Sequence, residues 1–176
     1  GDVKQFFPAV DHAILRSIIA RVIVDDDALW LVDQILASGQ GVLAEEYEVQ
    51  WFPGDDLLAA ARARGLPIGN LTSQFWANVY LNELDQFVKR ELKCRHYIRY
   101  VDDILLFASD KPTLHAWRQA VIAKLAELRL VLHEGRAQVY PVQHGIPFLG
   151  FRVCPTHRRL KRTKGITFQR RFKALR

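Results

Sequence analysis

Apolar positions recur along much of the chain at spacings of three and four residues, which predicts amphipathic helices. The helices are expected to begin after Asp11, near Asp25, near residue 72 and after Ser109 or Asp110, with the third continuing to about residue 92. Their buried faces are expected at Ile14, Leu15, Ile18, Ile19 and Val22; at Ala28, Leu31, Val32, Ile35 and Leu36; at Trp76, Val79, Tyr80, Leu84, Phe87 and Val88; and at Leu114, Trp117, Val121, Leu125 and Leu128.

Short runs of aromatic and β-branched residues predict strands between these helices. The expected strands are residues 2–7, the two flanks of the Asp102-Asp103 pair, and residues 129–133, 138–141 and 147–153. Residues 42–69 carry turn sequences such as Pro53-Gly54 and are predicted to be an irregular insertion. This order of elements favours an α+β fold in which helices cover one face of an antiparallel sheet.

The composition is that of one globular domain, because 49% of the 176 residues are hydrophobic and 25% are charged. No apolar run is long enough to span a bilayer, and we find no signal peptide, so we expect a cytoplasmic protein without a membrane partner. Cys94 and Cys154 are too few for a disulfide framework or a zinc site and are expected to be reduced thiols.

Charge is distributed unevenly along the chain, although the net charge is only +6. The last nineteen residues hold nine basic side chains and no acid, whereas the rest holds 16 Lys and Arg against 19 Asp and Glu. The basic residues are Arg158, Arg159, Lys161, Arg162, Lys164, Arg170, Arg171, Lys173 and Arg176. Such a tail favours a polyanionic partner such as a phosphate backbone; a solvated helix end is the alternative.

Asp102 and Asp103 stand between two apolar strand segments, so a hairpin would carry both carboxylates at its turn. Adjacent like charges repel, and a divalent cation such as Mg²⁺ or Mn²⁺ is a suitable compensator. A solvated Asp-Asp turn is the alternative. If the predicted strand at residues 2–7 brings Asp2 beside this pair, three carboxylates could hold two metal ions about 3.5–4 Å apart for phosphoryl chemistry.

Four segments in this order resemble the motifs of a reverse transcriptase palm, and the resemblance covers nearly the whole chain. They are Asp2-Val3-Lys4-Gln5-Phe6-Phe7, Gly65-Leu66-Pro67-Ile68-Gly69-Asn70-Leu71-Thr72-Ser73-Gln74, Tyr100-Val101-Asp102-Asp103 and Phe148-Leu149-Gly150. The resemblance implies a right-hand polymerase palm with a ferredoxin- or RRM-like core over residues 1–156. The basic residues 157–176 would be the start of a thumb.

The resemblance also implies an RNA-directed DNA polymerase, which transfers a nucleotide from a dNTP to the 3′-hydroxyl of a DNA or RNA primer on an RNA template. Asp2, Asp102 and Asp103 would be catalytic and would bind two Mg²⁺ ions, with the Val3 carbonyl as a further ligand. The remaining implied contacts are Phe7 (as a steric gate), Ile68 and Gly69 for the nucleotide, and Ser73, Gln74, Tyr100, Phe148, Leu149 and Gly150 for primer and template. The basic tail residues Arg158, Arg159, Lys161, Arg162 and Lys164 would contact nucleic acid.

Two departures from the usual family pattern affect function. Many members have Gln-Gly and Ser-Pro where this chain has Ile68-Gly69 and Ser73-Gln74, and this form resembles the bacterial diversity-generating retroelements. That resemblance implies error-prone copying in mutagenic retrohoming, with a small basic accessory protein; group II intron and retron enzymes are the alternatives. Arg136 stands where the family often has a lysine as general acid, and arginine can neutralise phosphate charge but transfers protons poorly. His133 is the alternative proton donor.

Two further functional classes remain open at this point, a non-catalytic RNA-binding palm and a nucleotide cyclase. The clustered acids argue against the first, and the Phe148 turn and basic tail argue against the second. The fingers segment that precedes Asp2 in the family is missing from this sequence, so we expect a fragment. Whether the fragment polymerises DNA without fingers and thumb is left open.

Overall fold

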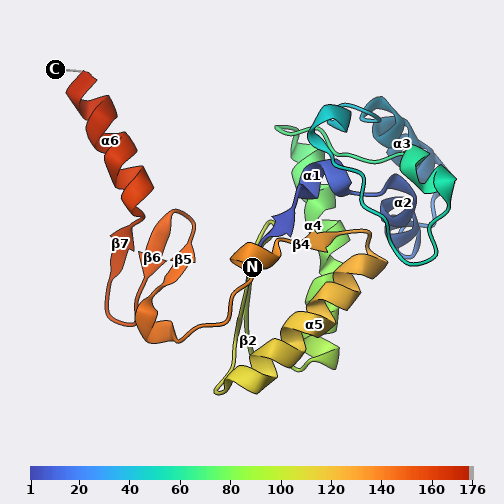
Figure 1. The fold of residues 1–176 in the computed structure, drawn as a ribbon. Coiled ribbons are helices and arrows are strands. Elements are labelled where there is room, and N and C mark those ends of the chain that lie inside the picture. The colour runs from blue at the N-terminus through green and yellow to red at the C-terminus, as the bar shows by residue number, and fades with distance from the viewer. Residues whose placement is uncertain (175–176) are drawn as a thin grey trace. The chain divides into compact units, whose positions relative to one another are not determined.

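The computed structural model describes the backbone of residues 1–174 and the side chains of this range except Thr163 and Lys164. The chain divides into two compact units, Gly1–Gln138 and Val139–Arg176 (Figure 1). The predicted α+β class is confirmed, since helices are combined with small antiparallel sheets. The predicted functional boundary after residue 156 lies inside the second unit and stays a prediction.

Four short strands of the first unit pair in an antiparallel arrangement. Strands β2 (His96–Tyr100) and β3 (Asp103–Phe107) form a hairpin, and β1 (Val3–Lys4) pairs with β4 (Val131–Leu132). A bridge between Asp2 and Asp103 joins the two pairs. Hydrogen bonds from Val3 N to Asp102 O (3.3 Å) and from His133 N to Asp2 O (2.7 Å) hold the first residues of the chain between β3 and β4.

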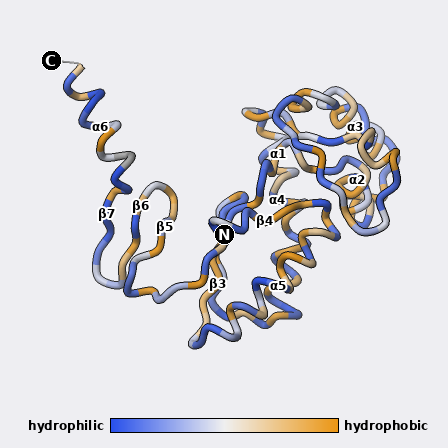
Figure 2. Tube along the Cα trace, viewed as in Figure 1, coloured by the Kyte–Doolittle hydropathy of each residue, from blue (hydrophilic) through white to orange (hydrophobic). Residues whose placement is uncertain are grey.

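Three helices of the first unit begin where the sequence places capping aspartates. Helices α2 (His12–Ala20), α3 (Asp26–Ser38) and α5 (Lys111–Glu127) follow Asp11, Asp25 and Asp110, whose carboxylates accept hydrogen bonds from backbone N–H groups in the first turn. Helix α4 spans Leu71–Gln86 and continues as a π-helical turn, η3 (Phe87–Glu91), while α1 (Phe6–Ala9) is a single short turn. Hydrophobic and hydrophilic residues alternate along α5, as expected for a helix with one buried face (Figure 2).

The core of the first unit lies between the helices and the sheet. Trp76, Tyr80, Leu84 and Val88 recur every four residues and are all buried, which confirms most of the face predicted for α4. The Tyr80 hydroxyl donates to the Leu128 carbonyl (2.7 Å), so a buried hydrogen bond ties α4 to the end of α5. In α3, Val32 and Leu36 are buried but Leu31 is 53% exposed, so the predicted face of that helix is too wide.

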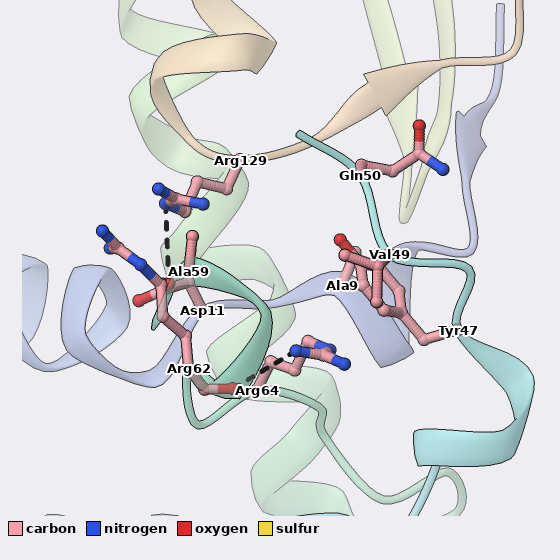
Figure 3. A pocket seen from close by; sticks show the side chains of 9 residues that line it. All are labelled: Ala9, Asp11, Tyr47, Val49, Gln50, Ala59, Arg62, Arg64 and Arg129. Atoms are coloured by element: carbon pink, nitrogen blue, oxygen red, sulfur yellow. Dashed lines mark hydrogen bonds and ion pairs between the residues drawn. The ribbon is translucent and has the colours of Figure 1, made fainter. Parts of the chain in front are cut away.

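The insertion at residues 42–69 is irregular as predicted, apart from the short 3-10 helices η1 (Ala44–Glu46) and η2 (Leu57–Ala61). It is anchored by charge: Arg62 and Arg129 each lie 3.9 Å from the buried Asp11 carboxylate, and Arg129 also forms an ion pair with Asp55. Figure 3 shows Arg62 and Arg129 beside Asp11. The three residues line a small pocket of about 20 Å³. This volume holds about one water molecule, so we interpret the pocket as part of the anchor rather than a ligand site.

The second unit contains a three-stranded antiparallel sheet and a helix. Strands β5 (Ile146–Phe148), β6 (Phe151–Val153) and β7 (Arg158–Leu160) pair in chain order and are followed by α6 (Arg162–Ala174). The β5–β6 turn uses Leu149 (φ 47°) and Gly150 (φ 84°), both in the left-handed region that a tight two-residue hairpin requires. Arg152 and Arg159 are direct cross-strand partners in this sheet.

Four of the predicted strands are wrong in extent or in kind, and the one at residues 129–133 is limited to β4. The strand predicted at residues 2–7 stops at Lys4, because Gln5 takes a left-handed conformation (φ 47°) and Phe6 and Phe7 enter α1. The strand predicted at 138–141 is not formed, and the boundary between the two units falls there. The segment 147–153 is a hairpin of two strands, because the Leu149-Gly150 turn interrupts it.

Strand β7 and helix α6 were not predicted, since charged residues dominate both. Figure 2 shows α6 as largely hydrophilic. None of the helices among the described residues combines the length and the apolar character that crossing a bilayer requires.

Candidate active site

The acid pair lies at the tip of the β2–β3 hairpin. Tyr100 and Asp103 are the last paired residues, so Val101 and Asp102 form a two-residue turn. Val101 has a φ of 53°, whereas Asp102 does not have a positive φ. A positive φ at the first turn position alone is typical of a type II′ turn, which normally takes glycine there. The sequence correctly predicts the hairpin, and the structure adds a strained valine beside the acids.

Asp2 is brought to this turn from the amino-terminal end of the sequence. It forms an antiparallel bridge with Asp103, flanked by hydrogen bonds from Val3 N to Asp102 O (3.3 Å) and from Ile104 N to Gly1 O (2.8 Å). These bonds make Asp2 and Asp103 a non-hydrogen-bonded pair, the type with the closer side chains, and directly opposed residues share one face of a sheet. Residues one hundred positions apart therefore meet at one site.

The electrostatics of the site are those of crowded carboxylates. Burial raises the pKa of Asp102 above its ordinary value, and the charges of Asp2 and Asp103 and a hydrogen bond with Asp2 add to the increase. Arg136 compensates part of the negative charge, because its Nη1 lies 2.5 Å from Asp2 Oδ2. The Arg136 side chain is 66% exposed, against 18% for Asp2, so the arginine reaches the acid from the solvent side.

The donors at this site suit a hard divalent cation in their chemistry. Carboxylate oxygens are the ligands that Mg²⁺ prefers, and the raised pKa of Asp102 marks a place where positive charge would be favourable. Within the described part of the chain, however, no three His, Cys, Asp or Glu side chains are arranged as a ready-made metal site. In the structure Asp2 forms an ion pair with Arg136, and a metal ion that used Asp2 as a ligand would compete with this pair.

Comparison with known proteins agrees with this geometry. The family model described as "Reverse transcriptase (RNA-dependent DNA polymerase)" matches residues 1–153. The chain belongs to the reverse transcriptase family. It also resembles the Escherichia coli (strain K12) protein named "Protein YkfC", with 24% identity over 186 residues. That match covers 87% of this chain but 45% of the relative, so the chain spans less than half the length of that protein.

The residues that the family resemblance assigns to the nucleotide lie on two elements. Phe7 is half-buried in α1, edge-on to Phe6, and its carbonyl accepts a hydrogen bond from Leu66 N (2.9 Å). Ile68 is 64% exposed, and Gly69 has a φ of 101° just before α4. The left-handed backbone explains the glycine. The contacts of these residues with a nucleotide stay predictions.

The template and primer residues differ in accessibility. Ser73 is buried at 2% exposure, whereas its neighbour Gln74 is exposed on the first turn of α4. Tyr100 is 57% exposed beside the acids, where a primer terminus could reach it. Phe148, Leu149 and Gly150 form the tip of the β5–β6 hairpin in the second unit. Gln74 and Tyr100 are therefore accessible to a ligand, whereas Ser73 is not.

Of the basic residues, Arg158 and Arg159 lie on β7, Lys161 follows that strand and Arg162 begins α6; all four are exposed. The predicted contacts of the Lys164 side chain and of Arg176 lie outside the described residues. Arg158 also lies over the Phe151 ring, with 5.5 Å between the guanidinium carbon and the ring centroid.

Sequence reasoning missed Arg99, which contacts the turn that carries Asp102. Its Nη1 donates to the Val101 carbonyl (3.0 Å), and its guanidinium pairs with Asp85 of α4. A signal was present in the sequence, because Tyr97 and Arg99 alternate with exposed residues and so share the helix-facing side of β2. A charged residue on that side requires a partner of opposite charge.

Proposed function

We propose that the full-length protein containing this chain copies RNA into DNA by nucleotidyl transfer from a dNTP to a primer 3′-hydroxyl. The single observation that supports this most strongly is the bridge that brings Asp2 to Asp103 beside Asp102. The family match over residues 1–153 gives the class of chemistry. Since the chain spans less than half of its relative, the activity belongs to a larger protein in this proposal.

Asp2, Asp102 and Asp103 would hold two Mg²⁺ ions, or Mn²⁺, with the Val3 carbonyl as a further ligand. Bound there, the metal ions would lower the pKa of the primer hydroxyl and stabilise the leaving pyrophosphate. The Arg136 guanidinium, which forms an ion pair with Asp2 in the structure, would then be free to bind the phosphates of the substrate. In this proposal Arg136 takes the electrostatic part of the family's lysine, and His133 is the alternative proton donor.

The second unit would bind the nucleic acid backbone. Residues 139–176 contain ten Lys and Arg and no Asp or Glu, so no acid within the unit neutralises them. The cross-strand pairing of Arg152 with Arg159 sets two like charges opposite each other, which is unfavourable until an anion lies between them. We therefore add Arg152 to the predicted contacts Arg158, Arg159, Lys161, Arg162 and Lys164.

A salt titration tests this binding role. Each phosphate contact that is lost should reduce the slope of log K against log salt by about 0.7 to 0.9. Replacing Arg152, Arg158 and Arg159 with glutamine should lower the slope for primer-template binding by about two to three. Replacing Arg16 with glutamine, on α2 of the first unit, should leave the slope unchanged. An unchanged slope in the triple variant would contradict the role.

At a finer level we propose a reverse transcriptase of the diversity-generating type, supported by the sequence Ile68-Gly69-Asn70-Leu71-Thr72-Ser73-Gln74. Ile68 is exposed and offers no side-chain hydrogen bond, so base selection would be loose and copying error-prone. A small basic accessory protein would be a partner. Group II intron and retron enzymes are the alternatives, and ordinary fidelity at template adenine in a misincorporation assay would favour them.

Primer extension on an RNA template by the full-length protein is the deciding experiment. The wild type and a surface control, Asp33→Asn, should extend the primer with dNTPs and Mg²⁺, and Asp102→Ala should abolish extension. If none of the three extends a primer while all bind RNA equally, the palm is a non-catalytic RNA-binding module. The observation that favours this second function is the Arg136–Asp2 ion pair, because it occupies the carboxylate that a metal ion would need.

A further inference from the structure

The turn that carries the acids is held in a conformation that its own sequence disfavours. Val101 has a φ of 53°, and a left-handed backbone is unfavourable for an L-residue, with β-branched side chains among the least tolerant. Such a conformation persists only where surrounding contacts maintain it. The contacts that maintain it here should therefore be identifiable.

The Val101 carbonyl accepts a hydrogen bond from the Arg99 side chain. Its Nη1 donates to the Val101 carbonyl oxygen (3.0 Å) and to Asn78 Oδ1 (3.0 Å). Its Nε and Nη2 donate to the two carboxylate oxygens of Asp85 (2.8 and 2.6 Å), a bidentate pair. The Tyr97 hydroxyl donates to Asp85 as well (2.7 Å). The guanidinium is thereby fixed between α4 and the turn.

The position of this pair favours a strong interaction. The Arg99 side chain is 11% exposed and that of Asp85 is 25% exposed, so water screens the pair far less than it screens surface ion pairs. A hydrogen bond from a charged group is also stronger than one between neutral groups. The bond from Arg99 to the Val101 carbonyl therefore opposes the strain of the turn.

The Val101 carbonyl belongs to the central peptide of the turn, which joins Val101 to Asp102. Type I′ and type II′ turns differ by a rotation of this peptide, and the rotation redirects the backbone of the second turn residue. A donor placed on the carbonyl oxygen therefore favours one orientation of the peptide. That orientation decides where the Asp102 carboxylate points relative to Asp2.

We propose that Arg99 is a positioning residue that locks the Val101–Asp102 peptide in its type II′ orientation, with Asp85 and Asn78 of α4 as its support. Arg99 touches neither metal nor substrate in this assignment and acts through the turn. The inference rests on the proposed function for its catalytic consequence, because Asp102 matters for turnover only if the acids are the reaction centre.

Kinetics of the full-length protein test the catalytic part. Arg99→Gln should lower kcat for primer extension about 10- to 100-fold with a smaller change in KM for dNTP. Arg99→Lys keeps the charge but cannot contact Asp85 at two points and Val101 at once, so it should lose most of the same activity. The control Arg16→Gln removes a helix–helix ion pair with Asp33 outside the site and should change neither parameter.

A second substitution separates positioning from general stabilisation. Glycine adopts a positive φ without strain, so the double variant Arg99→Gln with Val101→Gly should regain at least fivefold in kcat over Arg99→Gln. A role limited to tying β2 to α4 would give no such recovery, because Val101→Gly restores no contact with Asp85. Absence of rescue, with kcat following the loss of thermal stability, would overturn the proposal.

NMR of selectively valine-labelled full-length protein tests the turn itself, whatever the activity. The Cα and Cβ shifts of Val101 should agree between the wild type and Arg16→Gln and should move in Arg99→Gln, because rotation of the Val101–Asp102 peptide changes the ψ angle of Val101. Unchanged Val101 shifts in Arg99→Gln would refute the lock even if the enzyme is active. Changed shifts in a protein that never extends a primer would uphold the lock and reject the proposed function.

Discussion

Replacing Arg136 with glutamine should make the acid site bind divalent cations more tightly. Arg136 Nη1 lies 2.5 Å from Asp2 Oδ2, and a metal ion at Asp2 has to displace or weaken this contact. Removing the guanidinium therefore removes a competitor of the metal. Glutamine keeps much of the side-chain length and takes away only the charge.

The size of the effect follows from the exposure of the pair. Arg136 is 66% exposed, and ion pairs that are open to solvent contribute about 0.2–1 kcal/mol. Since 1.4 kcal/mol corresponds to a tenfold change in an equilibrium constant, the affinity should rise about 1.4- to 5-fold. Screening by salt weakens exposed pairs, so the gain should shrink as ionic strength increases.

Mn²⁺ titration of the full-length protein, followed by electron paramagnetic resonance at low and high salt, measures this change. Arg118→Gln is the matched control, because it removes the same charge from an ion pair with Glu134 (3.0 Å), which lies two residues from Arg136. If Arg136→Gln binds Mn²⁺ no better than Arg118→Gln, the ion pair does not compete with the metal. Primer extension by Arg136→Gln should fall although metal affinity rises, because the arginine would no longer meet the substrate phosphates.

Three further measurements test other parts of the structure. Burial, with the charges of Asp2 and Asp103, raises the pKa of Asp102. In the metal-free protein the contribution of this group to stability is therefore fully present below its unfolded-state pKa, about 4, and is lost as pH rises through the higher folded-state pKa. In urea unfolding with EDTA, the stability of the wild type should fall relative to that of Asp102→Asn as pH rises through this range, and parallel pH profiles would refute it. Tyr80→Phe should cost about 1–3 kcal/mol in urea unfolding, because it leaves the buried Leu128 carbonyl without its donor, and a loss below about 0.5 kcal/mol would contradict this. In Gly69→Ala the added methyl group would meet no atom within 4 Å, but alanine would have to adopt a φ of 101°. This backbone strain alone should cost about 1 kcal/mol or more of stability. An unchanged midpoint of urea unfolding would count against that conformation.

The sequence determines the features that rest on local interactions. Asp11, Asp25 and Asp110 each cap a helix through a hydrogen bond to a backbone N–H three residues later, so a capping residue followed by a periodic apolar pattern is sufficient to predict these helix starts. The hairpin at Asp102-Asp103 likewise needs only neighbouring residues. Conversely, β7 is too short and too charged to give such a signal.

The tertiary structure alone decides what assembles at the acids. Asp2 reaches Asp103 because the amino-terminal segment is held between β3 and β4, and Arg136 reaches Asp2 across 134 positions of sequence. Arg99 is held at the turn because α4 places Asp85 within hydrogen-bond distance of its guanidinium. Hydrophobic periodicity states which face of an element is buried but not which element covers it, so contacts between distant segments are fixed only when the chain packs.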